Sequence, residues 1–137
     1  MTPAFRFLLD TDTVSDLVRH PQGAVARRIR DVGAGSVCTS IVVAAELRLG
    51  ARKRGSERLS RQLEAILSVL PVIPLEEPVD QRYAEIRLRL EQAGTPIGPN
   101  DLLIAAQAQA LGLTVVSGNA REFRRAPGLK VDNWLVE

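Results

Sequence analysis

The sequence predicts an α/β protein in which a parallel sheet of about four or five short strands is flanked by helices on both faces. Short apolar segments such as 5–9 and 114–116 have the length of buried strands. Segments with a helical spacing of apolar residues lie between them, and glycines or prolines separate the two kinds of segment. This alternation is typical of a parallel sheet, because each return to the same edge needs a crossover helix.

The length of 137 residues fits a single domain over residues 1–137. Charged residues make up 25% of the chain, and no apolar run approaches the roughly 20 residues that cross a bilayer. The N-terminus has no basic segment followed by an apolar core, and Cys38 is the only cysteine, so a disulfide within the chain is excluded. These features favour a cytoplasmic protein with no membrane partner.

The first half of the chain is predicted to alternate strands with helix pairs. Thr39 or Ser40 can cap the third helix, and Gly55 ends it. Pro71 ends the fourth helix. In chain order we expect strand 5–9, helix 13–20, a helix from 24 to about 32, strand 37–39, a helix from 41 to 54 and a helix from 56 to 70.

The second half is predicted to contain strands 72–75, 114–116 and 130–132. A helix follows Glu76 and continues to Ala93, with Tyr83, Ile86, Leu90 and Ala93 facing inward. The glycines and prolines of 94–99 predict a stiff loop, after which Asn100 caps a helix over 102–111. That helix is apolar on nearly every side, so we expect it to be packed on several faces.

Polar side chains follow two of these strands and begin one of the helices. Asp10 comes directly after the first strand, with Asp12 two residues later, and Ser117, with Asn119 behind it, follows strand four. Asp101 lies beside the predicted cap of the apolar helix. Open parallel sheets bind ligands at the carboxyl ends of their strands, so we expect these groups to converge. Ser117 either bonds a site acid or a metal-bound water, or bonds its own backbone.

The carboxylates also have structural explanations when taken singly. Glu46 lies in an apolar helix segment, where a salt bridge to Arg48 or Arg52 would hold it. Asp101 would meet the positive end of its helix dipole. Asp10 is harder to explain in this way, because its strand offers no local partner.

Taken together, Asp10, Glu46 and Asp101 predict a divalent-metal site. Like charges that converge repel one another unless a cation lies among them, and carboxylate oxygens suit Mg²⁺ or Mn²⁺. Such an ion can polarise a phosphodiester and activate a water molecule. The chain has one histidine, His20, and one cysteine, so neither a Ser–His–Asp triad nor a zinc site can be assembled from the usual sets.

The positive charge is mostly arginine and is clustered, although the formal net charge is only +2. Arginine forks match phosphate geometry, but a solvated helix face is the more common reason for such a cluster. An aromatic content of 4% excludes a base-stacking RNA module. Arg48 and Arg121 are the candidate RNA-binding residues. The clusters are Arg27, Arg28 and Arg30; Arg48, Arg52, Lys53 and Arg54; and Arg121, Arg124 and Arg125.

Four motifs carry a family resemblance, and they span nearly the whole chain. They are FLLDTDTVS at 7–15, AAELRLG at 44–50, GTPIGPNDLLIAA at 94–106 and VVSGNAREF at 115–123. Their order and spacing resemble those of the PIN-domain ribonuclease toxins of the VapC family, and the third motif is the most specific.

The resemblance implies a three-layer PIN-like fold and a toxin that hydrolyses RNA phosphodiesters as an endoribonuclease, with structured RNA such as tRNA as the substrate class. It also implies that Asp10, Glu46 and Asp101 bind Mg²⁺ or Mn²⁺. A small VapB-like antitoxin would block the site, and the toxin would form a homodimer.

Two positions depart from the family's commonest pattern. The family usually has Asn where this chain has Asp12, and many members have a fourth Asp where this chain has Asn119, although a subset carries Asn there. An amide ligates a metal more weakly than a carboxylate does, so we expect one well-held ion. Ser117, Asn119, Asp12 and Asn100 are expected to support the site.

Two other functions fit parts of the sequence. The pattern of Asp10 and Asp12 after an apolar strand resembles the haloacid-dehalogenase-like phosphatases, with a nucleophile and an acid/base two residues apart. Those enzymes need further downstream residues, and only 20 residues follow Ser117 here, with Lys130 and Asp132 among them. A non-catalytic RNA-binding protein with the PIN-like fold would be expected to lose its site acids, whereas three remain.

Overall fold

The computed structural model describes residues 4–135, and its centre is a five-stranded parallel sheet. The strand order is β3-β2-β1-β4-β5. The chain therefore adds β2 and β3 on one side of β1, crosses over, and adds β4 and β5 on the other side. The strands are β1 (Phe7–Leu9), β2 (Val37–Ser40), β3 (Val72–Ile73), β4 (Thr114–Val116) and β5 (Lys130–Asp132). The topological switch point of the sheet thus lies between β1 and β4, and open parallel sheets bind their ligands at such a point.

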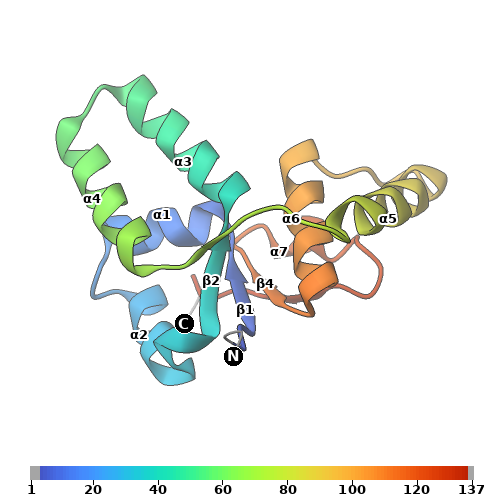
Figure 1. Ribbon diagram of the computed structural model, residues 1–137, viewed down its shortest axis with the longest axis horizontal. Helices are drawn as coiled ribbons and strands as arrows, with labels where there is room; N and C mark the ends of the chain where they lie inside the picture. Colours follow the sequence, from blue (N-terminus) through green and yellow to red (C-terminus); the bar gives the residue numbers. More distant parts are fainter. Residues whose placement is uncertain (1–3, 136–137) are drawn as a thin grey trace.

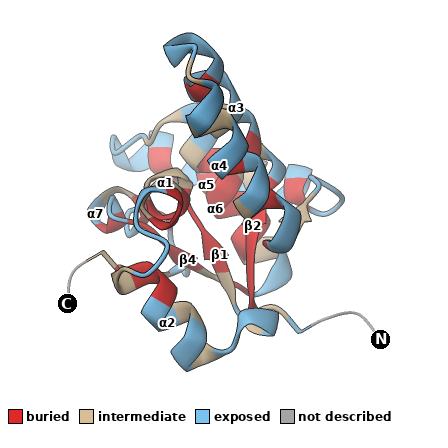
Figure 2. Cartoon of the chain, turned by 90° about the vertical axis from the view of Figure 1, so that its left-hand side faces the viewer, coloured by how far each residue is buried: buried red, intermediate tan, exposed pale blue. Residues whose placement is uncertain are grey.

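Helices cover the sheet, as predicted for this fold class. Figure 1 shows α3 and α4 side by side as a hairpin on one side of the molecule, with α5 and α6 on the other. In Figure 2 the strands are buried and the exposed surface lies on the outer sides of the helices. The helices are α1 (Thr11–Arg19), α2 (Ala24–Val32), the 3-10 turn η1 (Ala34–Ser36), α3 (Ile41–Arg54), α4 (Glu57–Val69), α5 (Val79–Ala93), α6 (Pro99–Leu111) and α7 (Ala120–Phe123).

The core runs between the sheet and helix α6. Leu8 and Leu9 of the central strand are fully buried, and so are Ile104 and Ala105 of α6. The prediction that this helix packs on several faces is confirmed, since even Gln107 is fully buried. Its side-chain amide donates hydrogen bonds to the carbonyl oxygens of residues 73 and 74, at 3.2 and 3.0 Å, and so ties α6 to the end of β3.

Several predicted boundaries were wrong for identifiable reasons. The first strand begins at Phe7 and the third ends at Ile73, because the sheet ladder reaches only that far. Helix α1 begins at Thr11, two residues before its predicted start, with Asp10 at its N-cap position. Ala93 is exposed rather than inward-facing, because α5 ends there and Gly94 turns the chain with a left-handed φ of 70°.

Asn100 does not cap α6, which corrects the prediction. The N-cap is Gly98, and Pro99 occupies the first helical position, where its fixed φ suits a helix start and its missing N–H leaves no donor unsatisfied. Asn100 is therefore an exposed residue of the first turn. The short helix α7 was not predicted at all. Within residues 4–135, no helix is long and apolar enough to span a bilayer.

Candidate active site

Asp10 lies at the carboxyl end of β1, beside the end of β4. Its backbone N–H donates to the carbonyl oxygen of Val116 at 2.9 Å, which extends the β1–β4 ladder by one step. Only 4% of the residue is exposed. Ser117 Oγ donates to Asp10 Oδ2 at 2.8 Å, whereas Asp10 Oδ1 is buried with no hydrogen-bond partner in the described part of the chain.

The burial of Asp10 has an electrostatic consequence. Desolvation raises the pKa of its carboxyl group, and the nearby charges of Asp12 and Glu46 raise it further. The neighbouring backbone N–H of Thr11 and the hydrogen bond from Ser117 act in the opposite direction but do not compensate. A carboxylate in this position needs either a proton or a cation.

Asp101 lies in the first turn of α6 and faces the same acids. Its pKa is raised from 3.8 to about 7, first by burial, then by the charge of Asp10, and then by a hydrogen bond with Glu122 and the charges of Glu122 and Glu46. A helix N-terminus alone would lower this pKa, so the helix dipole does not dominate the environment of Asp101. The topology therefore brings Asp10, Glu46 and Asp101 to one edge of the sheet.

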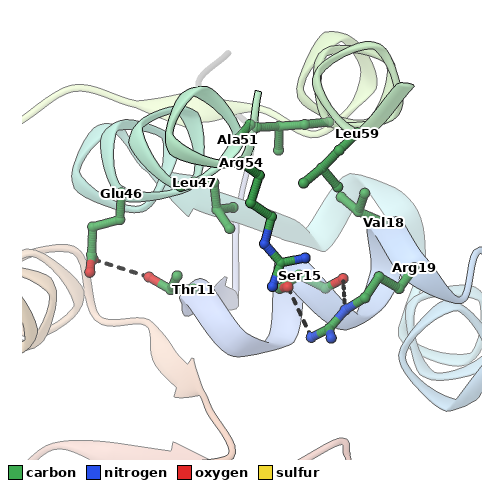
Figure 3. A pocket seen from close by; sticks show the side chains of 11 residues that line it. Thr11, Ser15, Val18, Arg19, Glu46, Leu47, Ala51, Arg54 and Leu59 are labelled. Carbon is green, nitrogen blue, oxygen red and sulfur yellow. Dashed lines mark hydrogen bonds between the residues drawn. The ribbon is translucent and has the colours of Figure 1, made fainter. Parts of the chain in front are cut away.

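Glu46 reaches this edge from helix α3 and is half-buried. Its Oε1 accepts a hydrogen bond of 3.0 Å from Thr11 Oγ1, as Figure 3 shows. The salt bridge considered for Glu46 does not form: Arg48 pairs with Glu64 of α4 instead, at 2.9 and 3.0 Å. Within residues 4–135, Arg52 makes no salt bridge to Glu46 either.

Glu122 of α7 is an acid of this site that sequence reasoning missed. Its Oε1 accepts from the Gly98 backbone N–H at 2.9 Å, its Oε2 accepts from the Asn119 side-chain amide, and it shares a hydrogen bond with Asp101. The Gly98 bond contributes most to lowering the pKa of Glu122, whereas the pKa of Asp101 is raised. The signal that could have identified it is its place in the VVSGNAREF motif, three residues after Asn119.

Ser117 and Asn119 lie behind the acids. The Ser117 hydroxyl makes both of the bonds that were considered for it, because it donates to Asp10 and accepts from the Asn119 backbone N–H at 2.9 Å. Asn119 directs its side-chain amide to Glu122. Arg121 is exposed on α7.

Asp12 ties helix α1 to the loop after β4. Its Oδ1 accepts from the Gly118 backbone N–H at 3.2 Å and from Thr13 Oγ1 at 3.3 Å. A Cβ atom at position 118 would come within 2.6 Å of Asp12 Oδ2 and of a methyl carbon of Leu135. A side chain at position 118 would therefore displace the ends of the Asp12 and Leu135 side chains, and glycine lets Asp12 lie against this loop beside the acidic residues.

The carboxylate oxygens of Asp10, Glu46 and Asp101 are suitable ligands for a hard cation, but the three side chains do not converge on one point. Within residues 4–135, no three Asp, Glu, His or Cys side chains lie at the spacing of a complete metal site. Two observations still favour a cation: the unpartnered, buried Oδ1 of Asp10, and the raised pKa values of Asp10 and Asp101. Both indicate negative charge that the protein leaves uncompensated.

Comparison with known proteins assigns the family. The profile of the PIN domain matches residues 7–129. The chain is 33% identical to the tRNA(fMet)-specific endonuclease VapC of Salmonella typhimurium over 94% of its own length and 98% of that protein. It is 34% identical to Ribonuclease VapC2 of Haemophilus influenzae, over 95% and 98%.

Solved structures agree with these relatives. The Rickettsia felis VapBC2 structure, bound to a promoter DNA fragment, contains a chain with a TM-score of 0.87 and 32% identity, covering 95% of this chain and 99% of that one. The DNA-bound VapBC structure of Salmonella typhimurium gives a TM-score of 0.85 and 33% identity, with 95% and 98% covered. The chain belongs to the PIN-domain family and, within it, to the VapC ribonucleases.

The family assignment resolves the alternatives raised by the sequence. The pattern of Asp10 and Asp12 belongs to a PIN domain and not to a haloacid-dehalogenase-like phosphatase. The curated relatives are named as nucleases, which argues against a non-catalytic RNA-binding protein. PIN-domain nucleases generally depend on a divalent metal.

Proposed function

We propose that this protein is a divalent-metal-dependent endoribonuclease and the toxin of a toxin–antitoxin pair, with Asp10, Glu46 and Asp101 as ligands of Mg²⁺ or Mn²⁺. The observation that carries the proposal is the buried carboxylate of Asp10, with one unpartnered oxygen, beside Asp101 with a pKa raised to about 7. Charges brought together away from water are costly unless a cation compensates them. A divalent cation at this position would also supply the charge stabilisation that phosphodiester hydrolysis uses.

The residues around the acids have separate tasks in this proposal. A bound divalent ion would polarise the scissile phosphate and lower the pKa of a water molecule. Ser117 holds Asp10 through Oδ2, which leaves Oδ1 for the ion, and the Thr11 hydroxyl orients Glu46 in the same way. Glu122 fixes the backbone at Gly98, immediately before the helix that carries Asp101. Because Asn119 is engaged with Glu122, we propose one firmly held ion.

The substrate and partner follow from the relatives. A relative from Salmonella typhimurium is named for cleavage of tRNA(fMet), so we propose this tRNA as the first substrate to test. The similar solved structures are VapBC complexes, and we propose that a VapB-like antitoxin covers the acidic edge of a toxin homodimer. The activity is proposed to be cytoplasmic, where tRNA is found.

The test is cleavage of a tRNA(fMet) transcript by the purified protein with Mg²⁺ or Mn²⁺. Asp10→Asn should reduce the rate by at least about 10²- to 10³-fold, because it removes charge that stabilises the reacting centre. Asp31→Asn, on the exposed end of α2, is the matched control and should cleave normally. EDTA should abolish cleavage, and excess metal should restore it.

Two results would overturn the proposal. Cleavage that persists in EDTA or in the Asp10→Asn variant excludes the metal mechanism. Release of phosphate from a small phosphomonoester, with no cleavage of RNA, would instead indicate a phosphatase.

A further inference from the structure

A pocket extends from Glu46 away from the other acids, between helices α1, α3 and α4 (Figure 3). Its volume is about 280 Å³. The acidic end is formed by Glu46 and Thr11, which are hydrogen-bonded to each other. The walls are apolar and consist of Val18, Leu47, Ala51, Leu59 and Leu63. The pocket is therefore continuous with the proposed catalytic edge.

Two arginines close the far end of this pocket. Arg19 comes from the last turn of α1 and Arg54 is the last residue of α3, and in Figure 3 both guanidinium groups point toward Ser15. Arg19 donates to Ser15 Oγ at 3.1 Å, which holds its side chain in place. Neither arginine has a salt-bridge partner within residues 4–135, whereas the neighbouring Arg48 is neutralised by Glu64. The pocket thus has a carboxylate at one end and two uncompensated cations at the other.

We propose that Arg19 and Arg54 bind a backbone phosphate of the RNA substrate, a few nucleotides away from the scissile bond. This inference rests on the proposed ribonuclease function. Two adjacent guanidinium groups offer forked donors that match phosphate oxygens. Eight residues of helix separate Glu46 from Arg54, about 12 Å at the usual helical rise. This distance is longer than one nucleotide, so the arginines would contact a phosphate other than the scissile one.

The continuity of the pocket with Glu46 favours RNA over an acidic peptide as the occupant. A phosphodiester that reaches the acids must continue across the protein surface on both sides, and this pocket is one of the paths that leave Glu46. The pocket wall contains no aromatic ring on which a base could stack. The contact therefore positions the strand without reading its sequence.

The test measures RNA binding separately from cleavage. In the Asp10→Asn background, the Arg19→Gln/Arg54→Gln variant and its parent are titrated against a fluorescent tRNA(fMet) transcript at several salt concentrations. We expect the Kd to rise about tenfold and the slope of log K against log salt to fall by about one, because one phosphate contact is lost. With Asp10 intact, the same double substitution should raise KM and leave kcat nearly unchanged.

The control is Arg30→Gln/Arg89→Gln, which removes the same charge from exposed residues of α2 and α5. It should bind nearly as the parent does, and melting curves should show that all variants fold. Unchanged RNA binding in Arg19→Gln/Arg54→Gln, or an equal loss in the control, would overturn the proposal. So would weaker binding of poly-L-glutamate with unchanged binding of RNA, since the site would then recognise peptide carboxylates. Failure of the ribonuclease function itself would appear differently, as absent cleavage by the wild-type protein.

Discussion

The carboxyl edge of the sheet and the α3–α4 hairpin hold their charges in opposite ways. At the edge, Asp10 is 4% exposed, one of its oxygens has no partner, and burial raises the pKa of its carboxyl group. On the hairpin, Arg48 and Glu64 form a two-bond pair with about half of each side chain exposed, and the pair lowers the pKa of Glu64. The Arg48–Glu64 pair neutralises its own charge, whereas Asp10, Glu46 and Asp101 have no salt-bridge partner within residues 4–135.

The contrast distinguishes charges that serve a function from charges that only decorate the surface of the fold. A solvated ion pair adds little to folding and costs little to form. Buried carboxylates that repel one another destabilise the folded state, and they persist where a ligand compensates for them. The two regions should therefore respond differently to metal, to pH and to mutation.

Divalent metal should produce the largest difference. An ion that binds only the folded protein stabilises it by about 2.7 kcal/mol at a hundredfold excess over its Kd, a Tm shift of roughly 8 °C for a chain of this size. Thermal melting in millimolar Mg²⁺ or Mn²⁺ against EDTA should show this shift for the wild type and for Arg48→Gln. The Asp10→Asn/Asp101→Asn variant should lose most of it. An equal shift in that variant would place the bound metal elsewhere.

The pH dependence of stability should show a smaller effect at Asp101. Its pKa is about 7 in the folded protein against an ordinary 3.8, so between these values the folded state holds a proton that the unfolded state has released. The contribution of Asp101 to stability therefore falls as pH rises from about 4 to about 7 and is constant above that range.

Asp101→Asn removes this proton exchange and provides the measurement. Without metal, the Tm of the wild type minus the Tm of Asp101→Asn should fall across this pH range by a few degrees at most, since water screens the half-buried group. Asp31→Asn is the control, and its Tm difference from the wild type should not follow this curve. A constant difference for Asp101→Asn would mean that Asp101 is not held near the other acids.

The smallest effect is expected on the hairpin. A double-mutant cycle with Arg48→Gln and Glu64→Gln, followed by urea unfolding, should give a coupling energy of about 0.2–1 kcal/mol. High salt should reduce it, because the pair is solvated. A coupling well above this range would mean that the hairpin also contains strongly desolvated charge, and the contrast between the two regions would fail.

The sequence predicted most of the fold because its signals are local. Apolar runs of strand length, helical stripes and terminating glycines identify the central elements, and the alternation of the two kinds of segment identifies a parallel sheet. The errors lie where tertiary contacts decide. Strand β3 is short because it pairs with β2 over only two positions, and α7 has four residues, too few to show a helical period.

The same distinction between local signals and tertiary contacts applies to the candidate site. Asp10 and Asp101 could be named from sequence, because each stands beside a recognisable element boundary, and the order of the strands then brings them together. The partners of these acids could not be named. Gly98 and Glu122 are 24 positions apart, Thr11 and Glu46 are 35 apart, and Arg48 and Glu64 are 16 apart.

An α/β fold with acids at the carboxyl ends of its strands follows from the amino-acid sequence, since residue spacing and strand-end position are properties of the chain. Only the folded structure shows that Ser117 holds Asp10 and Thr11 holds Glu46, that Gly98 and not Asn100 is the N-cap of α6, and that Glu122 joins the site. It also decided which arginines are neutralised and which remain available at the pocket. The physical reason is that hydrogen bonds and ion pairs depend on how whole helices pack against the sheet, and no local pattern encodes those distances.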